Sequence, residues 1–167
     1  MAIIDFHDID ALGRPSSADE KLSAACIEEA EQLDIKPAIG TTLLRLLSSE
    51  SSERINDLLN GCEYTGRDGE AASHKGIRKA LAYYAYARLV RAAGAGRLTR
   101  YAYVQNDADW SHHSDAADRQ AAYEEAFGIA DSYMQEIIHF LRSSSAYPEY
   151  KGRGVRNNRI SIEMIGR

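Results

Sequence analysis

The chain has 167 residues, of which 44% are hydrophobic and 27% are charged, and its formal net charge is −5. These proportions are typical of one soluble domain with a sizeable core. No apolar run approaches the roughly 20 residues that cross a bilayer, and the acidic start MAIIDFHDID lacks the basic character of a signal peptide, so we expect a cytoplasmic protein without a membrane partner.

The N-terminal part predicts a short apolar arm and then a first helix. The arm contains Ile3, Ile4, Phe6 and Ile9. The helix is expected over residues 18–33, where Ser16 or Ser17 can act as the N-cap and Glu20 can complete a capping box. The residues of its apolar stripe are Leu22, Cys26, Ala30 and Leu33.

A corner and two further short helices are expected next. Pro37 predicts the corner at residues 35–37, because proline disfavours helical geometry in the residue before it and suits the first turn of a new helix. The apolar face of the second helix is formed by Ile39, Leu43, Leu46 and Leu47, and that of the third by Ile55, Leu58 and Leu59.

Residues 61–70 carry three glycines and no apolar periodicity, which predicts an exposed loop or at most a tight hairpin. A glycine-rich phosphate loop would need one of two known spacings and a preceding strand, and this stretch has neither.

Residues 76–94 predict a buried central helix, around which the other elements pack. Residues 80–87 carry no charge, so this helix is apolar on more than one side. Its tyrosines need hydrogen-bond partners if they are buried. Ser73 is the expected N-cap, and Gly94 and Gly96 are the expected stop.

A basic and aromatic segment, GRLTRYAYVQND at residues 96–107, follows the central helix. Its side chains alternate with a period of two, which predicts a strand or an extended arm. Such segments suit a protein partner and are also compatible with single-stranded nucleic acid. The residues expected to form an assembly surface here are Arg97, Arg100, Tyr101, Tyr103 and Trp110.

A second long helix is expected over residues 116–142, with an apolar seam that steps by four and three residues and requires a partner helix. The seam consists of Tyr123, Phe127, Ala130, Met134, Ile137 and Leu141. The predicted fold is therefore mainly all-α, a bundle of four to five helices, two of them long, with extended or short β arms.

Residues 1–150 are expected to form the helical domain, and residues 151–167 a basic C-terminal arm. The arm alternates Ile160, Ile162 and Met164 with polar residues, and its other basic residues assigned to the assembly surface are Lys151, Arg153, Arg156 and Arg159.

Acidic and basic side chains alternate in bands along the chain. The net charges of the bands are −9, +7, −6 and +3 for residues 1–70, 71–106, 107–145 and 146–167. Bands of opposite sign either neutralise each other within one fold or meet between copies of the chain, and the pattern leaves both possibilities open.

The sequence offers no convincing catalytic or metal site. His112 and His113 lie near three aspartates, but adjacent histidines in a loop rarely bind one ion. His139 is expected beside the apolar seam, and His74 at the start of the central helix. Neither Cys26 nor Cys62 has a convincing histidine partner, so we expect free thiols, no cofactor and no enzymatic activity.

Three stretches carry a resemblance to a known family: IKPAIG at 35–40, LLNGCEYTGRDGEAASHKGIRKALAYYAYARLV at 58–90 and FLRSSSAYPEY at 140–150. Together with the order of the predicted elements, they resemble the head-tail connectors of tailed phages and prophages of the Bacteroides-phage type. Connectors are adaptor subunits located below the portal. The resemblance covers roughly residues 18–150 and includes no catalytic signature.

The resemblance implies a structural virion protein that forms a homo-oligomeric ring between the portal and the tail. Its neighbours would be the portal protein and tail or stopper proteins, with at most non-specific DNA contact in the lumen. It would be located in the virion, and in the host bacterial cytoplasm during assembly. The alternative is a nucleic-acid-binding regulatory helical protein, which the band of charge +7 favours and whose binding would depend strongly on salt.

Overall fold

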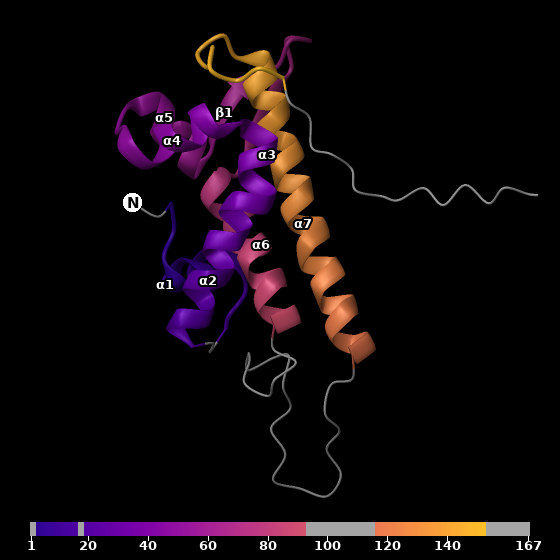
Figure 1. Ribbon diagram of the computed structural model, residues 1–167. Helices are drawn as coiled ribbons and strands as arrows, with labels where there is room; N and C mark the ends of the chain where they lie inside the picture. The colour runs from indigo at the N-terminus through magenta and orange to yellow at the C-terminus, as the bar shows by residue number, and fades with distance from the viewer. Residues whose placement is uncertain (1–2, 17–18, 93–115, 153–167) are drawn as a thin grey trace, which may run out of the picture.

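The computed structural model describes residues 3–16, 19–92 and 116–152, and the mainly α-helical fold expected from the sequence is confirmed (Figure 1). The chain starts with the short helix α1 (Phe6–Asp8) and the π-helical turn η1 (Ile9–Gly13). Asp5 caps α1, because its carboxylate accepts hydrogen bonds from the backbone N–H groups of His7 and Asp8.

The predicted corner at residues 35–37 is wrong. Helix α2 (Glu20–Ala30) continues without a break through the π-helical segment η2 (Glu31–Ile35) into α3 (Lys36–Ile39). A π-helical turn inserts one extra residue and changes the local hydrogen bonding, so that Pro37, which has no N–H, is accommodated just after it. The break comes instead at Gly40, whose φ of +88° suits glycine.

Two other expectations for this helix also need correction. The N-cap is Asp19, whose carboxylate accepts from the backbone N–H groups of Lys21 and Leu22, and not Ser16 or Ser17. Leu33 is 61% exposed, although it belonged to the predicted apolar stripe. The extra residue of η2 turns the helix, so that Ile35 takes the buried position.

Two short helices and a hairpin follow, namely α4 (Thr41–Ser49), α5 (Glu53–Asn60), β1 (Cys62–Thr65) and β2 (Ala71–His74). The strands pair antiparallel, so the hairpin alternative for the glycine-rich stretch is correct. Ser73 lies within β2 and does not cap the central helix, which begins three residues after His74. His74 therefore ends a strand, where its side chain is buried.

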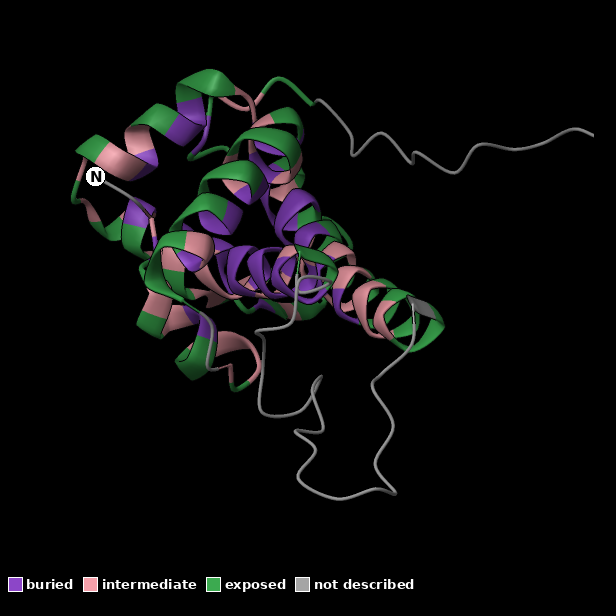
Figure 2. Cartoon of the chain, turned by 60° about the horizontal axis from the view of Figure 1, so that its bottom comes forward, coloured by how far each residue is buried: buried purple, intermediate pink, exposed green. Residues whose placement is uncertain are grey.

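The central helix α6 (Ile77–Ala92) is buried on several sides, as its uncharged sequence predicts. It contacts η1, α2, α5 and α7. Figure 2 shows the buried residues gathered where these helices meet. The predicted end of this helix at Gly94 lies outside the described residues.

The long helix α7 (Ala116–Ser143) has the predicted bounds to within one residue, and its seam packs along α6. Ala130, Met134, Ile137 and Leu141 are buried, whereas Tyr123 and Phe127 are half-buried. The Tyr84 ring meets Phe127 edge-on at 5.0 Å, and the Tyr84 hydroxyl donates to Asp131 Oδ1 at 2.5 Å. Within the described parts of the chain, no helix is long and apolar enough to cross a membrane.

Candidate functional site

The structure describes one residue of the predicted assembly surface. Lys151 is exposed in the turn region after α7. The other predicted residues lie in residues 93–115 and 153–167, outside the described residues: Arg97, Arg100, Tyr101, Tyr103, Trp110, Arg153, Arg156 and Arg159. The site can therefore be built from the described elements to which these two segments are attached.

The two segments are attached at opposite ends of α7. Residues 93–115 connect α6 to α7 in the sequence, and the end of α6 and the start of α7 both lie at the bottom of Figure 1. Residues 144–152 follow the other end of α7, at the top of the same view. A helix of 28 residues is about 42 Å long, so the two attachment points are separated by roughly that distance.

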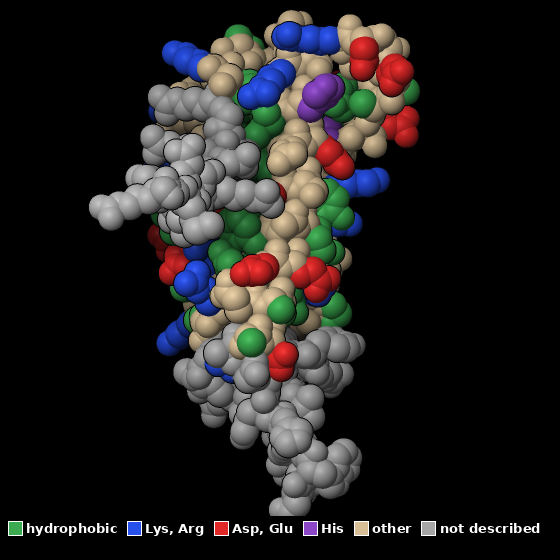
Figure 3. Space-filling view, turned by 90° about the vertical axis from the view of Figure 1, so that its right-hand side faces the viewer, with side chains coloured by type: hydrophobic (Ala, Val, Ile, Leu, Met, Phe, Trp, Pro, Cys, Tyr) green, Lys and Arg blue, Asp and Glu red, His purple; other side chains and the backbone are tan. Residues whose placement is uncertain are grey.

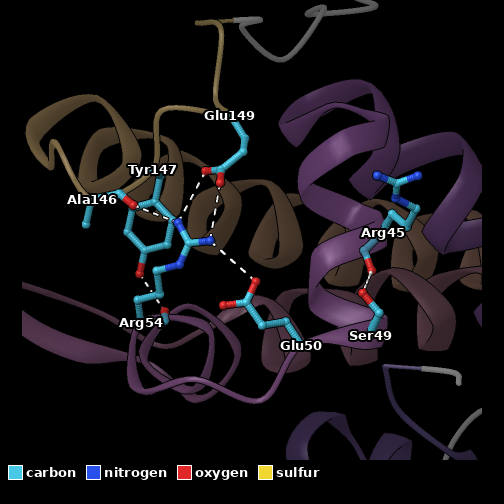
Figure 4. Close-up of polar contacts among 7 residues, drawn as sticks. All are labelled: Arg45, Ser49, Glu50, Arg54, Ala146, Tyr147 and Glu149. Atoms are coloured by element: carbon cyan, nitrogen blue, oxygen red, sulfur yellow. Dashed lines mark hydrogen bonds and ion pairs between the residues drawn. The ribbon is translucent and has the colours of Figure 1, made fainter.

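A cluster of polar contacts holds the chain just before residues 151–167, and we call it the Arg54 cluster (Figure 4). The Arg54 guanidinium, on α5, donates to the Ala146 carbonyl oxygen at 2.9 Å and to Glu149 Oε1 at 3.2 Å. Glu50 Oε2 lies 3.4 Å from the same guanidinium. In return, the Tyr147 hydroxyl donates to the Arg54 carbonyl oxygen at 2.6 Å.

Tyr147 adds an apolar contact to these polar ones. Its ring is 4% exposed and meets Phe140 of α7 edge-on at 5.4 Å. Burial raises the pKa of Tyr147 to about 12, so its hydroxyl remains a hydrogen-bond donor at neutral pH. The Arg54 cluster therefore fixes the point from which residues 151–167 extend.

Replacing Arg54 by alanine is expected to release residues 144–150 from α5 while the helical core stays folded. The amides of this segment should then exchange with deuterium faster than in the wild-type protein, because the guanidinium bonds to Ala146 and Glu149 are lost and only the Tyr147 bond to the backbone carbonyl of residue 54 is kept. Arg45→Ala is the matched control, since Arg45 is exposed on the neighbouring helix α4 and lies outside the cluster (Figure 4). Equal exchange rates in the two variants would contradict this role for Arg54.

The hairpin brings together a cysteine and a histidine, which the sequence analysis did not foresee. Cys62 and His74 face each other in the β1–β2 register, and Cys62 Sγ lies 3.4 Å from His74 Nε2. The backbone N–H of Gly76 lies 3.3 Å from His74 Nδ1, to which it donates. Because Nδ1 accepts this bond, the proton of the neutral ring lies on Nε2, facing the sulfur.

This arrangement does not suit nucleophilic catalysis. A general base must present an unprotonated nitrogen to the thiol, whereas His74 presents its N–H to Cys62. Burial also raises the pKa of the Cys62 thiol and lowers the pKa of His74, so that both groups are neutral at pH 7. The pair is a partly buried contact that joins the two strands.

The buried His74 makes the free energy of unfolding depend on pH. Its pKa is lowered in the folded state, mainly by burial, from about 6.5 in the unfolded chain. Below pH 6.5 the unfolded chain therefore takes up a proton that the folded chain does not, and the free energy of unfolding should fall by up to about 1.4 kcal/mol per pH unit. Urea titrations between pH 7.5 and 5.5 measure this slope.

His74→Gln should reduce the slope, whereas His139→Gln should retain it. His139 is exposed, and its Nδ1 lies 2.9 Å from the Tyr64 hydroxyl. An unchanged slope in the His74 variant would contradict the assignment.

Charged residues of the basic band are partly neutralised within the fold. Arg78 of α6 forms two hydrogen bonds of 3.0 Å with the Asp8 carboxylate, and Arg88 binds Asp34 Oδ2 at 2.6 Å. Glu29 lies 3.7 Å from Arg88. The first of the two possibilities left open by the charge pattern is thus realised between α6 and the acidic N-terminal elements.

Two further cations of α6 lie over tyrosine rings of α7. Lys79 Nζ is 5.6 Å from the centre of the Tyr133 ring, and the Arg91 guanidinium is 5.3 Å from that of Tyr123. On the face that α7 presents in Figure 3, acidic and basic side chains are interspersed. Among the described residues, α6 therefore offers little continuous basic surface to a nucleic acid.

Among the described residues, no group of three or more histidine, cysteine, aspartate or glutamate side chains could hold a metal ion. The predicted His112 and His113 cluster lies outside the described residues.

Comparison with known proteins places the chain in a family. A family model described as a family of unknown function, DUF6712, matches residues 35–160, which is more than half of the chain. The chain belongs to the DUF6712 family. No curated protein and no solved structure matches it.

The range shared with DUF6712 includes α4 to α7, the hairpin and the Arg54 cluster, but it starts after α2. The Arg54 cluster was missed by the sequence analysis, because its main contacts join residues more than ninety positions apart. The Cys62–His74 contact could have been predicted from one feature of the sequence. A symmetric hairpin through the glycine-rich stretch pairs these two positions.

Proposed function

We propose that this DUF6712 protein is a head-tail connector, a structural subunit that forms a ring between the portal and the tail of a tailed phage or prophage. The sequence resemblance in residues 35–40, 58–90 and 140–150 suggests the head-tail connector family. The observation that carries the proposal is that residues 93–115, which contain Tyr101, Tyr103 and Trp110, and the basic residues 153–167 are attached at opposite ends of α7.

Attachment at opposite ends suits assembly into a ring. A ring of identical subunits needs head-to-tail contacts, in which two different surfaces of one subunit meet its two neighbours. A single interaction surface would produce a two-fold dimer instead. Because their attachment points are about 42 Å apart, the two segments can reach two different neighbours, or a neighbour and the portal.

The partners that follow are other copies of the chain, the portal protein and tail or stopper proteins. The location is the virion, and the host bacterial cytoplasm during assembly. Contact with DNA would be non-specific and limited to the lumen of the ring. The geometry of the Cys62–His74 pair supports a structural role over an enzymatic one, because the pair is neutral and its proton faces the sulfur.

The nucleic-acid-binding alternative receives less support from the described residues. Arg78 and Arg88 bind carboxylates of the same chain, and Lys79 and Arg91 lie over tyrosine rings. A gel shift at low salt tests it directly, since counterion release makes such binding strongest there. Strong retardation that disappears at high salt would favour this alternative over the connector.

The connector proposal is tested by binding to the portal protein encoded by the same phage or prophage. The full chain and a variant that ends at Gly152, which keeps the Arg54 cluster, are compared for portal binding and thermal stability. We expect the truncated protein to remain folded and to bind the portal more weakly. Absence of the protein from purified virions, or portal binding by neither form, would overturn the proposal.

A further inference from the structure

A groove lies between the N-terminal arm and the helix α2–η2. It has a volume of about 510 Å³ and is open to solvent. Its lining residues are apolar at the base and acidic at the rim. The base is formed by the buried Ile4 and Ile27 and the half-buried Phe6, and the rim by the half-buried Glu31 and the exposed Asp5, Glu20, Ala24, Glu28 and Gln32.

Two of the rim carboxylates form no ion pair among the described residues. Asp5 caps α1, and Glu31 Oε1 accepts from the backbone N–H of Ile3 at 3.2 Å. By contrast, Glu20 and Glu28 are exposed and form no ion pair with a described cation. A groove with an apolar base and these rim charges suits a segment that alternates apolar and basic side chains.

The chain itself contains such a segment. We propose that the acidic groove binds residues 151–167 of a second copy of the chain. This segment carries five basic residues and one acidic residue, and its apolar side chains alternate at Ile160, Ile162 and Met164. Alternate side chains point to opposite faces of an extended chain, so all three can enter the groove together while arginines meet the rim.

The position of the groove favours a second copy over the same molecule. Figure 1 places α1 and α2 on one side of α6 and α7 on the other, and α6 contacts both α2 and α7. Residues 144–152 lie at the end of α7, and the eight residues from Gly152 to Ile160 span at most about 28 Å. Packed helices are 8–10 Å apart, so a path around α6 and α2 to their outer face would use nearly all of this length.

This inference deepens the proposed function, because it names one contact through which copies would assemble head to tail. It rests on the proposed function only for the step from pairs of subunits to a ring. The groove and its occupant would both belong to copies of this chain, and no portal is needed for them to meet.

Disulfide cross-linking between two full-length variants tests the contact. One variant carries Ala24→Cys in the groove and the other Ile162→Cys, and the two are mixed and oxidised with diamide. A disulfide requires the two Cα atoms to approach to within about 7 Å, so a linked pair reports insertion into the groove. Native Cys26 is buried with its pKa raised to about 11, and the oxidised wild-type protein controls for Cys62.

The matched control places the thiol on α7, at the exposed position Ala121. We expect several-fold more linked dimer with Ala24→Cys than with Ala121→Cys, and Glu28→Lys in the groove variant should lower the yield by about two- to fivefold. Equal yields from the two positions would overturn the proposal. So would a disulfide that forms only within a single chain carrying both Ala24→Cys and Ile162→Cys.

The outcome is separable from that of the portal experiment. Cross-linking between copies without portal binding would support the groove and overturn the connector proposal. Portal binding without preferential cross-linking would overturn the groove and leave the connector proposal standing.

Discussion

Replacing Gly76 by alanine is expected to destabilise the protein by about 3–5 kcal/mol, which is a large share of the stability of a typical domain. Two effects add up at this position. The backbone φ is +83°, which side chains other than glycine rarely adopt. A Cβ atom would also lie 2.3 Å from the Leu59 carbonyl oxygen and 2.6 Å from the Gly61 backbone nitrogen.

These contacts are with backbone atoms, so no side chain can move aside to relieve them. Gly61 and Gly76 form a close crossing between the end of α5 and the start of α6, because a Cβ on Gly61 would equally lie 2.3 Å from the His74 carbonyl oxygen. The hairpin begins and ends at this crossing. If the backbones of Gly61 and Gly76 were forced apart, both strands and the start of the central helix would be displaced together.

Gly69→Ala is the matched control for Gly76→Ala. Gly69 has a similar φ of +84°, but a Cβ there would meet nothing within 4 Å. Its replacement should cost only the conformational strain, about 1 kcal/mol, while Gly128→Ala in α7 should stabilise the protein by about 0.5–1 kcal/mol. Urea titrations of the three variants give these values. A loss in Gly76→Ala no larger than in Gly69→Ala would show that the backbones can separate at low cost.

The elements that the sequence predicts best are those whose own apolar pattern shows which side chains are buried. The uncharged run in α6 and the regular seam of α7 both indicate helices packed against each other, and α7 is found within one residue of its predicted bounds. Local periodicity is sufficient in these cases, because the partner of each helix is itself apolar.

The wrong secondary-structure predictions occur where distant contacts or an unusual local geometry determine the backbone conformation. Pro37 predicts a corner, but the π-helical segment before it changes the local hydrogen bonding, so that the helix continues although Pro37 has no N–H to donate. The residue types of Glu31–Ile35 do not predict a π-helical segment. Ser73 is a good N-cap by residue type, yet the hairpin holds it in a strand. In both places the tertiary structure overrides a local preference.

The candidate site was less predictable than the fold. The aromatic side chains of residues 93–115 and the basic side chains of residues 153–167 are recognisable from composition, but the attachment of these segments at opposite ends of α7 follows only from the packed positions of α6 and α7. The Arg54 cluster and the acidic groove each combine residues from separate elements. A charge pattern shows that such contacts are needed, and the three-dimensional fold decides which charges meet.

The pair formed by Arg88 and Asp34 gives the second large effect. Their side chains are 18% and 10% exposed, so the pair is largely buried between α6 and η2. Burial raises the pKa of Asp34 above its usual value even though Arg88 lies beside it and opposes that shift. Ionised Asp34 thus depends on Arg88, and Arg88→Leu should cost about 3 kcal/mol, because it leaves a buried carboxylate without its partner.

The double variant Asp34→Leu/Arg88→Leu is expected to recover most of that loss, to within about 1 kcal/mol of the wild-type protein, because it removes both desolvated charges. The deficit of Arg88→Leu should also shrink as the pH falls. The folded-state pKa of Asp34 is raised, so stability from its protonation is gained towards acid and lost as the pH rises. Arg78→Leu is the comparison, since the Arg78–Asp8 pair is more exposed, at 36% and 20%, and should contribute no more than about 1 kcal/mol. If the double variant were as unstable as Arg88→Leu alone, the pair would contribute through packing of its side chains and not through a stranded charge.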